Sequence, residues 1–241
     1  VPAPAAISGS VDNGLNGTLT WQAPLKRAAE LTWSNKTLAT SIGATATTPK
    51  LWVKQEFDAN DLIAYPDYQL TAVNAYFTGA VPTAMTLFVM RNGKIDYFQA
   101  LTDEEVAAIT ADSWNKFALT TPYKPEAGNT YAFGYYITHA KSLKPVGVDT
   151  ADEIATKGNS FSTSSPSSKG FDQSSPSWKT LASGDIHGNF MLTADVEPTG
   201  EVAEADEIAG YDVYADGELL AGNVTETTFS ETVDKLGEKT Y

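Results

Sequence analysis

The sequence contains no cysteine and only two histidines among its 241 residues. Without cysteine the chain has neither a disulfide framework nor thiol chemistry. His139 and His187 have no neighbours at the spacing of a metal site or a catalytic triad. The Gly-x-Ser-x-Gly, His-Glu-x-x-His, phosphate-loop and dinucleotide-binding patterns are also missing. Nothing positive therefore supports an enzyme, and we predict a non-catalytic protein.

Positive charge and long apolar runs are scarce as well. The 16 Lys and Arg are outnumbered by 30 Asp and Glu, which gives a net charge of −14. Because phosphate binding requires a basic surface, we predict no nucleic-acid partner. No apolar run is long enough to span a bilayer, so we predict no membrane insertion. Residues 1–4 lack the basic start and apolar stretch of an export signal, which we expect to lie outside this sequence.

The residues that are present favour folded β-structure. Hydrophobic residues make up 42% of the chain, and its 18 Gly and 12 Pro accompany many Thr, Ser, Tyr and Val. Residues 31–196 show short strand patterns separated by turn signals. The dipeptide Asn92-Gly93 between two apolar runs predicts a β-hairpin with a type I′ turn.

Two further local patterns break the series of strands. Thr102 followed by Glu105 is typical of a capping box, and it predicts one short helix ending near Ile109. Residues 160–177 are crowded with serine and contain Pro166, Gly170 and Pro176. We expect this segment to be a long exposed loop.

Two segments far apart in the sequence look like neighbouring strands of one small β-module. Residues 17–24 alternate apolar side chains up to Trp21, and residues 208–220 contain a strand pattern followed by an Asp216-Gly217 turn. These segments resemble the second and third strands of a fibronectin type III domain. The gap between them has the size of a whole domain, so we predict a separately folded insert.

The insert resembles the jelly-roll modules of the cleaved-adhesin and galactose-binding-like type in bacterial surface proteins. The segments that carry this resemblance are residues 68–77, 114–115, 133–135, 146–149, 157–159, 178–181 and 188–190. The resemblance implies an all-β chain in which a jelly-roll β-sandwich interrupts a fibronectin type III-like β-sandwich. We expect residues 1–24 to begin the outer module, residues 25–199 to form the jelly roll, and residues 200–241 to continue the outer module, which is truncated.

Calcium is the cofactor that the resemblance implies, because jelly rolls of this type often hold one structural calcium ion in a loop. Hard cations prefer clustered carboxylate and carbonyl oxygens. The candidate ligands are Asp58, Asp61, Asp149, Asp152 and Asp195. The alternative is that these carboxylates only keep an acidic protein in solution.

Two tryptophans are candidate ligand-binding residues. Trp52 and Trp178 could stack on sugar rings, as exposed aromatic side chains do in glycan-binding sandwiches, or they could fill a core.

The sequence thus predicts a non-catalytic adhesion or binding module of a secreted or cell-surface bacterial protein, associated with the outer membrane. Its expected partner is a host or bacterial surface protein or a glycan. The alternatives are a carbohydrate-binding module and an accessory part of a larger secreted hydrolase or protease.

Overall fold

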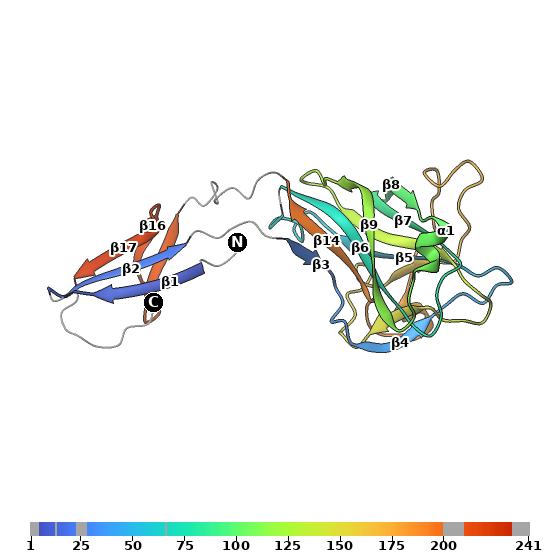
Figure 1. Ribbon diagram of the computed structural model, residues 1–241, viewed down its shortest axis with the longest axis horizontal. Coiled ribbons are helices and arrows are strands. Elements are labelled where there is room, and N and C mark those ends of the chain that lie inside the picture. The colour runs from blue at the N-terminus through green and yellow to red at the C-terminus, as the bar shows by residue number, and fades with distance from the viewer. Residues whose placement is uncertain (1–4, 13, 23–27, 66, 200–209, 233–241) are drawn as a thin grey trace. The chain divides into compact units, whose positions relative to one another are not determined.

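The computed structural model describes residues 5–12, 14–22, 28–65, 67–199 and 210–232 (Figure 1). The chain divides into two compact units. The small unit consists of Val1–Arg27 and Gly200–Tyr241, and the large unit is Ala28–Thr199. The described strands pair in antiparallel fashion, so the chain is all-β, as the sequence predicts. Among these residues no helix has the length and apolar character needed to cross a bilayer.

The small unit contains a three-stranded sheet and a hairpin. The sheet has the order β1 (Ala5–Val11), β2 (Asn16–Gln22) and β17 (Thr228–Thr232), and the hairpin pairs β15 (Tyr211–Ala215) with β16 (Glu218–Val224). Strands from both ends of the sequence therefore share one sheet.

A few apolar side chains of β2 and β15 make the core of the small unit. Trp21 is 7% exposed and meets the ring of Tyr211 edge-on at 5.1 Å, and Val213 is also buried. Asp216 (φ 49°) and Gly217 (φ 86°) supply the positive φ angles that the tight hairpin turn requires. The turn expected from this dipeptide is therefore present.

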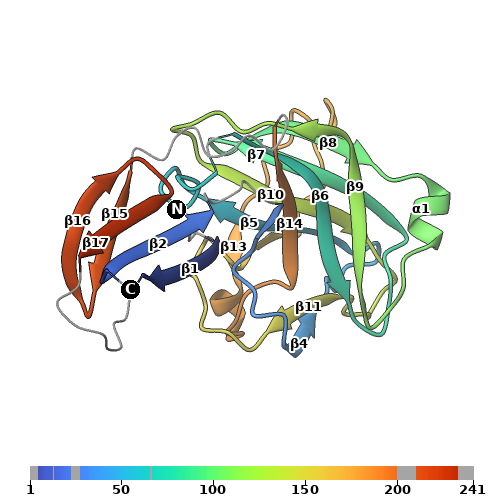
Figure 2. The same ribbon diagram turned by 60° about the vertical axis from the view of Figure 1, so that its left-hand side comes forward.

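The large unit is a β-sandwich of two antiparallel sheets (Figure 2). The first sheet has the order β13 (Lys179–Thr180), β12 (Ser160–Ser162), β5 (Lys50–Phe57), β10 (Tyr131–Thr138), β7 (Ala84–Arg91), β8 (Lys94–Ala100). The second has the order β3 (Ala29–Leu31), β14 (Leu192–Pro198), β6 (Tyr68–Phe77), β11 (Val146–Asp149), β4 (Leu38–Ile42), with β9 (Ser113–Tyr123) paired to β6.

The main core of the large unit is formed by the inward-facing residues of these strands. In β5, Leu51 and Val53 point inward while Trp52 points to the opposite face, as the period of two demands. Tyr135 and Phe77 meet in this core with ring centroids 5.7 Å apart. The first sheet is apolar on both faces, because a second cluster around Trp52 covers its outer side.

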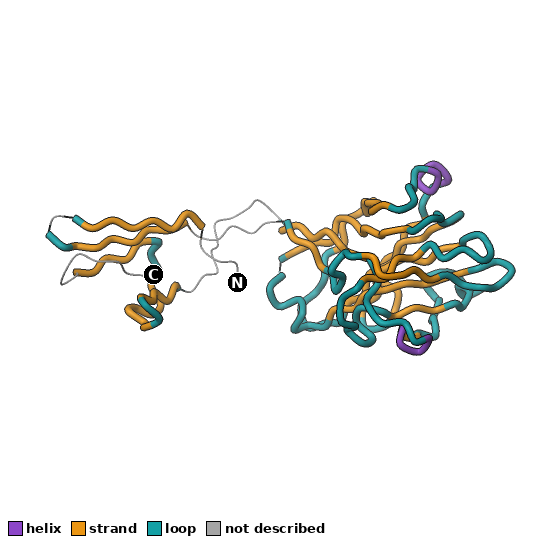
Figure 3. Tube along the Cα trace, turned by 90° about the horizontal axis from the view of Figure 1, so that it is seen from below, coloured by secondary structure: helices purple, strands orange, loops and turns teal. Residues whose placement is uncertain are grey.

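Among the described residues, helical structure is confined to α1 (Asp103–Ala107) and a 3₁₀ turn, η1 (Leu181–Gly184), at the periphery of the large unit (Figure 3). The predicted capping box is confirmed: the Thr102 N–H donates to Glu105 Oε2 at 2.7 Å, and the Glu105 N–H donates to Thr102 Oγ1 at 3.2 Å. The helix ends earlier than predicted, because Ile109 turns into the core. The predicted hairpin is also present, with φ values of 49° at Asn92 and 79° at Gly93.

Candidate functional site

A surface groove of about 330 Å³ lies at one end of the large unit, where β5 ends and β10 begins. Its two walls are residues 59–65, after β5, and residues 125–129, before β10. The lining residues are Ala59, Asn60, Leu62, Ile63, Tyr65, Pro125, Glu126, Ala127, Gly128 and Asn129. Ile63 is 79% exposed, the largest exposed fraction among the bulky apolar side chains described.

The first wall is held by a lysine between two aspartates. Lys157 Nζ donates to Asp58 Oδ2 at 2.8 Å and to Asp61 Oδ2 at 2.7 Å. Asp58 Oδ1 accepts from the N–H groups of Asn60 and Asp61, and Asp61 Oδ2 accepts from the Asp58 N–H. The ammonium group lowers the pKa of Asp58, and the two carboxylates raise the pKa of Lys157. Lys157 also lies 5.5 Å from the ring centre of Trp33.

The second wall is tied to the neighbouring β7–β8 turn and to β10. Arg91 Nη1 donates to Glu126 Oε2 at 2.8 Å, and Asn92 Nδ2 donates to Asn129 Oδ1 at 2.7 Å. The Glu126 N–H donates to the Tyr131 hydroxyl at 2.7 Å. Both walls are therefore held by polar contacts before any ligand arrives.

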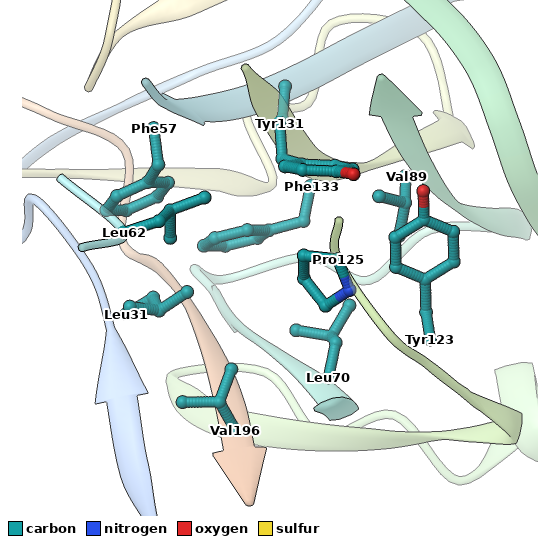
Figure 4. Close-up of a pocket in the computed structure, with 11 residues that line it drawn as sticks. Leu31, Phe57, Leu62, Leu70, Val89, Tyr123, Pro125, Tyr131, Phe133 and Val196 are labelled. Carbon is teal, nitrogen blue, oxygen red and sulfur yellow. The ribbon is translucent and has the colours of Figure 1, made fainter. Parts of the chain in front are cut away.

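A small apolar cavity of about 30 Å³ lies beneath the groove (Figure 4). Leu62 and Pro125 line both the groove and the cavity, so these two side chains lie between them. The other lining residues are Leu31, Phe57, Leu70, Val89, Tyr123, Tyr131, Ala132, Phe133 and Val196. The cavity has the size of about one water molecule, so it is too small to hold a larger ligand.

Asp149, another candidate calcium ligand, is fully buried and serves as a hydrogen-bond acceptor. Its Oδ1 accepts from the N–H groups of Asn189 (2.7 Å) and Ala151 (3.2 Å), and its Oδ2 accepts from the Asn35 N–H (2.8 Å). The carboxylate thus joins three loops. Its oxygens are directed at backbone donors.

The remaining acidic candidates lie in other settings. Asp152 is exposed, and its backbone carbonyl accepts from Asn189 Nδ2. Asp195, on β14, has an ion pair with Lys116 at 2.7 Å and accepts from Asn74 Nδ2 at 2.6 Å. Within the described ranges, no three His, Cys, Asp or Glu side chains gather to hold a metal ion. The structure brings only Asp58 and Asp61 together, and calcium binding stays a prediction.

The two candidate tryptophans meet in one aromatic cluster on the outer face of the first sheet. Trp52 is fully buried, and Trp178 is half-buried. The ring of Phe171 stacks on Trp52 at 4.7 Å, and Trp178 lies 6.3 Å from Phe88. Neither tryptophan therefore presents an open platform. No sequence pattern marked Phe171, which lies within the serine-rich loop.

The histidines have ordinary surroundings. His139 is buried, and its Nε2 accepts from the Ala44 N–H at 3.0 Å, so it has a structural role. His187 is exposed beside Glu153 and Asp185.

No known family profile matches this sequence, and no curated protein is significantly similar to it. The functional argument therefore rests on the residues and their geometry.

Proposed function

We propose that this chain is a non-catalytic binding module of a secreted or cell-surface protein, and that it holds a protein partner in the groove between residues 59–65 and 125–129. The observation that carries the proposal is Ile63, which is 79% exposed beside Leu62, Tyr65 and Pro125. A concave surface with apolar side chains and a polar rim is typical of a binding site. Aliphatic and aromatic anchors of this kind supply most of the binding energy in protein interfaces.

The fixed walls of the groove favour binding as well. Lys157 holds the turn at Asp58 and Asp61, and Asn129 is held by Asn92. Because these loops are ordered beforehand, association costs less conformational entropy.

Charge identifies the chemistry of the partner. The large unit contains 18 Asp and Glu against 12 Lys and Arg. In the groove itself, Glu126 is 70% exposed despite its ion pair with Arg91. Complementarity therefore favours a protein surface that presents an apolar side chain next to a lysine or arginine.

We propose as the finer architecture a jelly roll inserted in a fibronectin type III-like module, and the strand order of the small unit supports the second part of this proposal. In the small unit, β1, β2 and β17 share one sheet, and β15 and β16 form the other. Immunoglobulin-like sandwiches likewise place their first, second and fifth strands together and begin the other sheet with the third. The large unit interrupts the small one between β2 and β15.

A binding array of purified extracellular proteins and glycans tests the proposal. We expect the full chain to bind a basic protein on the array, with an affinity that falls as salt screens the charges. Ile63→Asp should weaken this binding at least tenfold. Ile154→Asp is the matched control, because Ile154 is a partly exposed isoleucine outside the groove. Equal binding by the two variants would refute the proposed groove.

A further inference from the structure

The outer face of the first sheet carries an apolar cluster that is separate from the main core. It consists of Trp52, Phe88, Met90 and Ala132, with Tyr136 packed beside them. Tyr136 is paired directly opposite Trp52 in the β5–β10 register, and their rings are 4.7 Å apart. Central strands that face solvent usually alternate with polar side chains. Here the outer face is aromatic, and a loop covers it.

The covering loop consists of residues 163–178. It connects β12 to β13, which are neighbouring strands of the first sheet. Its ends are held together because Phe161 in β12 pairs with Lys179 in β13. Such compact surface loops are frequently functional. Gly170 has a φ of 132°, a conformation that side chains rarely adopt. It precedes Phe171, which packs against the aromatic face, as does Trp178 at the end of the loop.

The ring of Phe171 packs against three aromatic rings of this outer face. Its ring stacks on Trp52 at 4.7 Å with an interplanar angle of 28°, and it lies 5.3 Å from Phe98 and 6.0 Å from Tyr136. Phe98 is itself 48% exposed. Phe171 therefore fills the position that a flat ring ligand would take on this face.

The serine residues of the loop make few hydrogen bonds to the sheet. Two hydrogen bonds tie it to β5, from Trp52 Nε1 to the Ser164 carbonyl at 2.8 Å and from Lys50 Nζ to Ser165 Oγ at 3.3 Å. Bonds such as that from the Ser167 N–H to Ser174 Oγ close the loop on itself and can persist when it moves. Displacement of the middle of the loop thus mainly requires that Phe171 leave its place, while Trp178 at its end stays beside β13.

The face beneath the loop also offers polar groups. Lys54 is buried at 6% exposure, forms an ion pair with Glu56, and lies 4.8 Å from the ring centre of Trp178. A pyranose presents weakly positive C–H bonds to the negative face of an aromatic ring, and its hydroxyls need donors and acceptors at the ring edge. Trp52 supplies the aromatic face, and the Lys54–Glu56 ion pair follows it along the same face of β5.

We infer that the outer face of the first sheet, around Trp52 and Tyr136, is a carbohydrate-binding site. In the closed state Phe171 occupies this site, and loop 163–178 is a cover that a sugar can displace. A sugar ring takes the place of the Phe171 ring on Trp52. This site is additional to the proposed protein-binding groove. A ligand must displace Phe171, and the burial of such a ring makes the wild-type affinity on the order of 30-fold weaker than that of an open site.

The test compares Phe171→Ala with the wild-type full chain. The probes are soluble tetrasaccharides of β-linked glucose, xylose, mannose and galactose, titrated by calorimetry. We expect Phe171→Ala to bind one of them on the order of 30-fold more tightly than the wild type does. Phe161→Ala is the control, because Phe161 is a partly buried ring that packs against the main core. It should bring no gain. Adding Tyr136→Ala to Phe171→Ala should remove the gain.

Opening of the cover can be measured without a sugar, because the chain has no cysteine of its own. Met90→Cys places a single thiol in the covered cluster, and Phe171→Ala should accelerate its labelling by a small thiol reagent at least tenfold. An unchanged labelling rate would refute the claim that Phe171 holds loop 163–178 over this face. Failure of all four sugars to bind Phe171→Ala would overturn the carbohydrate site, as would binding only of a phenylalanine-containing peptide. Ile63→Asp should leave sugar binding unchanged. The test of the carbohydrate site is therefore independent of the test of the protein-binding groove.

Discussion

Replacing Asp149 by alanine is expected to destabilise the large unit strongly. The Asp149 carboxylate is fully buried and accepts hydrogen bonds from the backbone N–H groups of Asn35, Ala151 and Asn189. These three donors belong to separate loops, so the substitution removes one shared connection between them. It also leaves the buried Asn189 N–H and the two partly buried N–H groups of Asn35 and Ala151 without their acceptor.

The magnitude follows from the cost of those donors. A hydrogen bond to a charged group contributes about 1.5 to 3 kcal/mol, and a buried donor left unsatisfied costs about 1 to 3 kcal/mol. Removing a buried carboxylate also removes its desolvation cost, which offsets part of the loss. We therefore expect Asp149→Ala to lower the free energy of unfolding by about 3 kcal/mol. For a unit of this size that corresponds to a fall in Tm of roughly 6 to 12 °C.

Urea unfolding followed by tryptophan fluorescence measures this effect, because four of the five tryptophans belong to the large unit. Asp152→Ala is the matched control, since Asp152 is an exposed aspartate in the adjoining loop. It should change the free energy of unfolding by less than about 0.5 kcal/mol. If Asp149→Ala were as mild as Asp152→Ala, the account of a carboxylate that joins three loops would be refuted.

Two further substitutions test other features of the large unit. In the wild type the Lys157 ammonium group lies between Asp58 and Asp61, where a calcium ion could bind once the lysine is removed. Millimolar calcium should therefore raise the Tm of Lys157→Gln more than that of the wild type. An equal rise in both proteins would contradict this prediction. Lys157 lowers the pKa of Asp58, so the stability from this contact is present above pH about 4 and is lost as the pH falls through the lowered pKa; the acid side of the stability profile of Lys157→Gln should be shallower. Tyr135→Phe should stabilise the fold by about 1 kcal/mol in urea unfolding, because the buried Tyr135 hydroxyl has no hydrogen-bond partner among the described residues; a loss of stability would show that this hydroxyl is satisfied.

The sequence predicted the features that local chemistry determines. The Asn92-Gly93 turn and the capping box of Thr102 and Glu105 depend on residues within a few positions of each other. The all-β character followed from the strand and turn patterns.

The site could be predicted only in part, because its contacts join distant residues. Asp58 was a candidate ligand, but its partner Lys157 lies about a hundred residues further along the chain. Trp52 was a candidate either for stacking on a sugar ring or for filling a core, but nothing near it in the sequence shows that Phe171 covers it. Ile63 stands in a short apolar run with Leu62 and Tyr65, and such a run does not show which side chain stays exposed.

The measurement that tests the central claim most directly is hydrogen–deuterium exchange of the full chain with and without the basic protein identified on the binding array. Binding in the groove predicts slower exchange in residues 59–65 and 125–129. Loop 163–178 should exchange at an unchanged rate. Protection elsewhere, with these two segments unaffected, would contradict the proposal that the chain holds its protein partner in this groove.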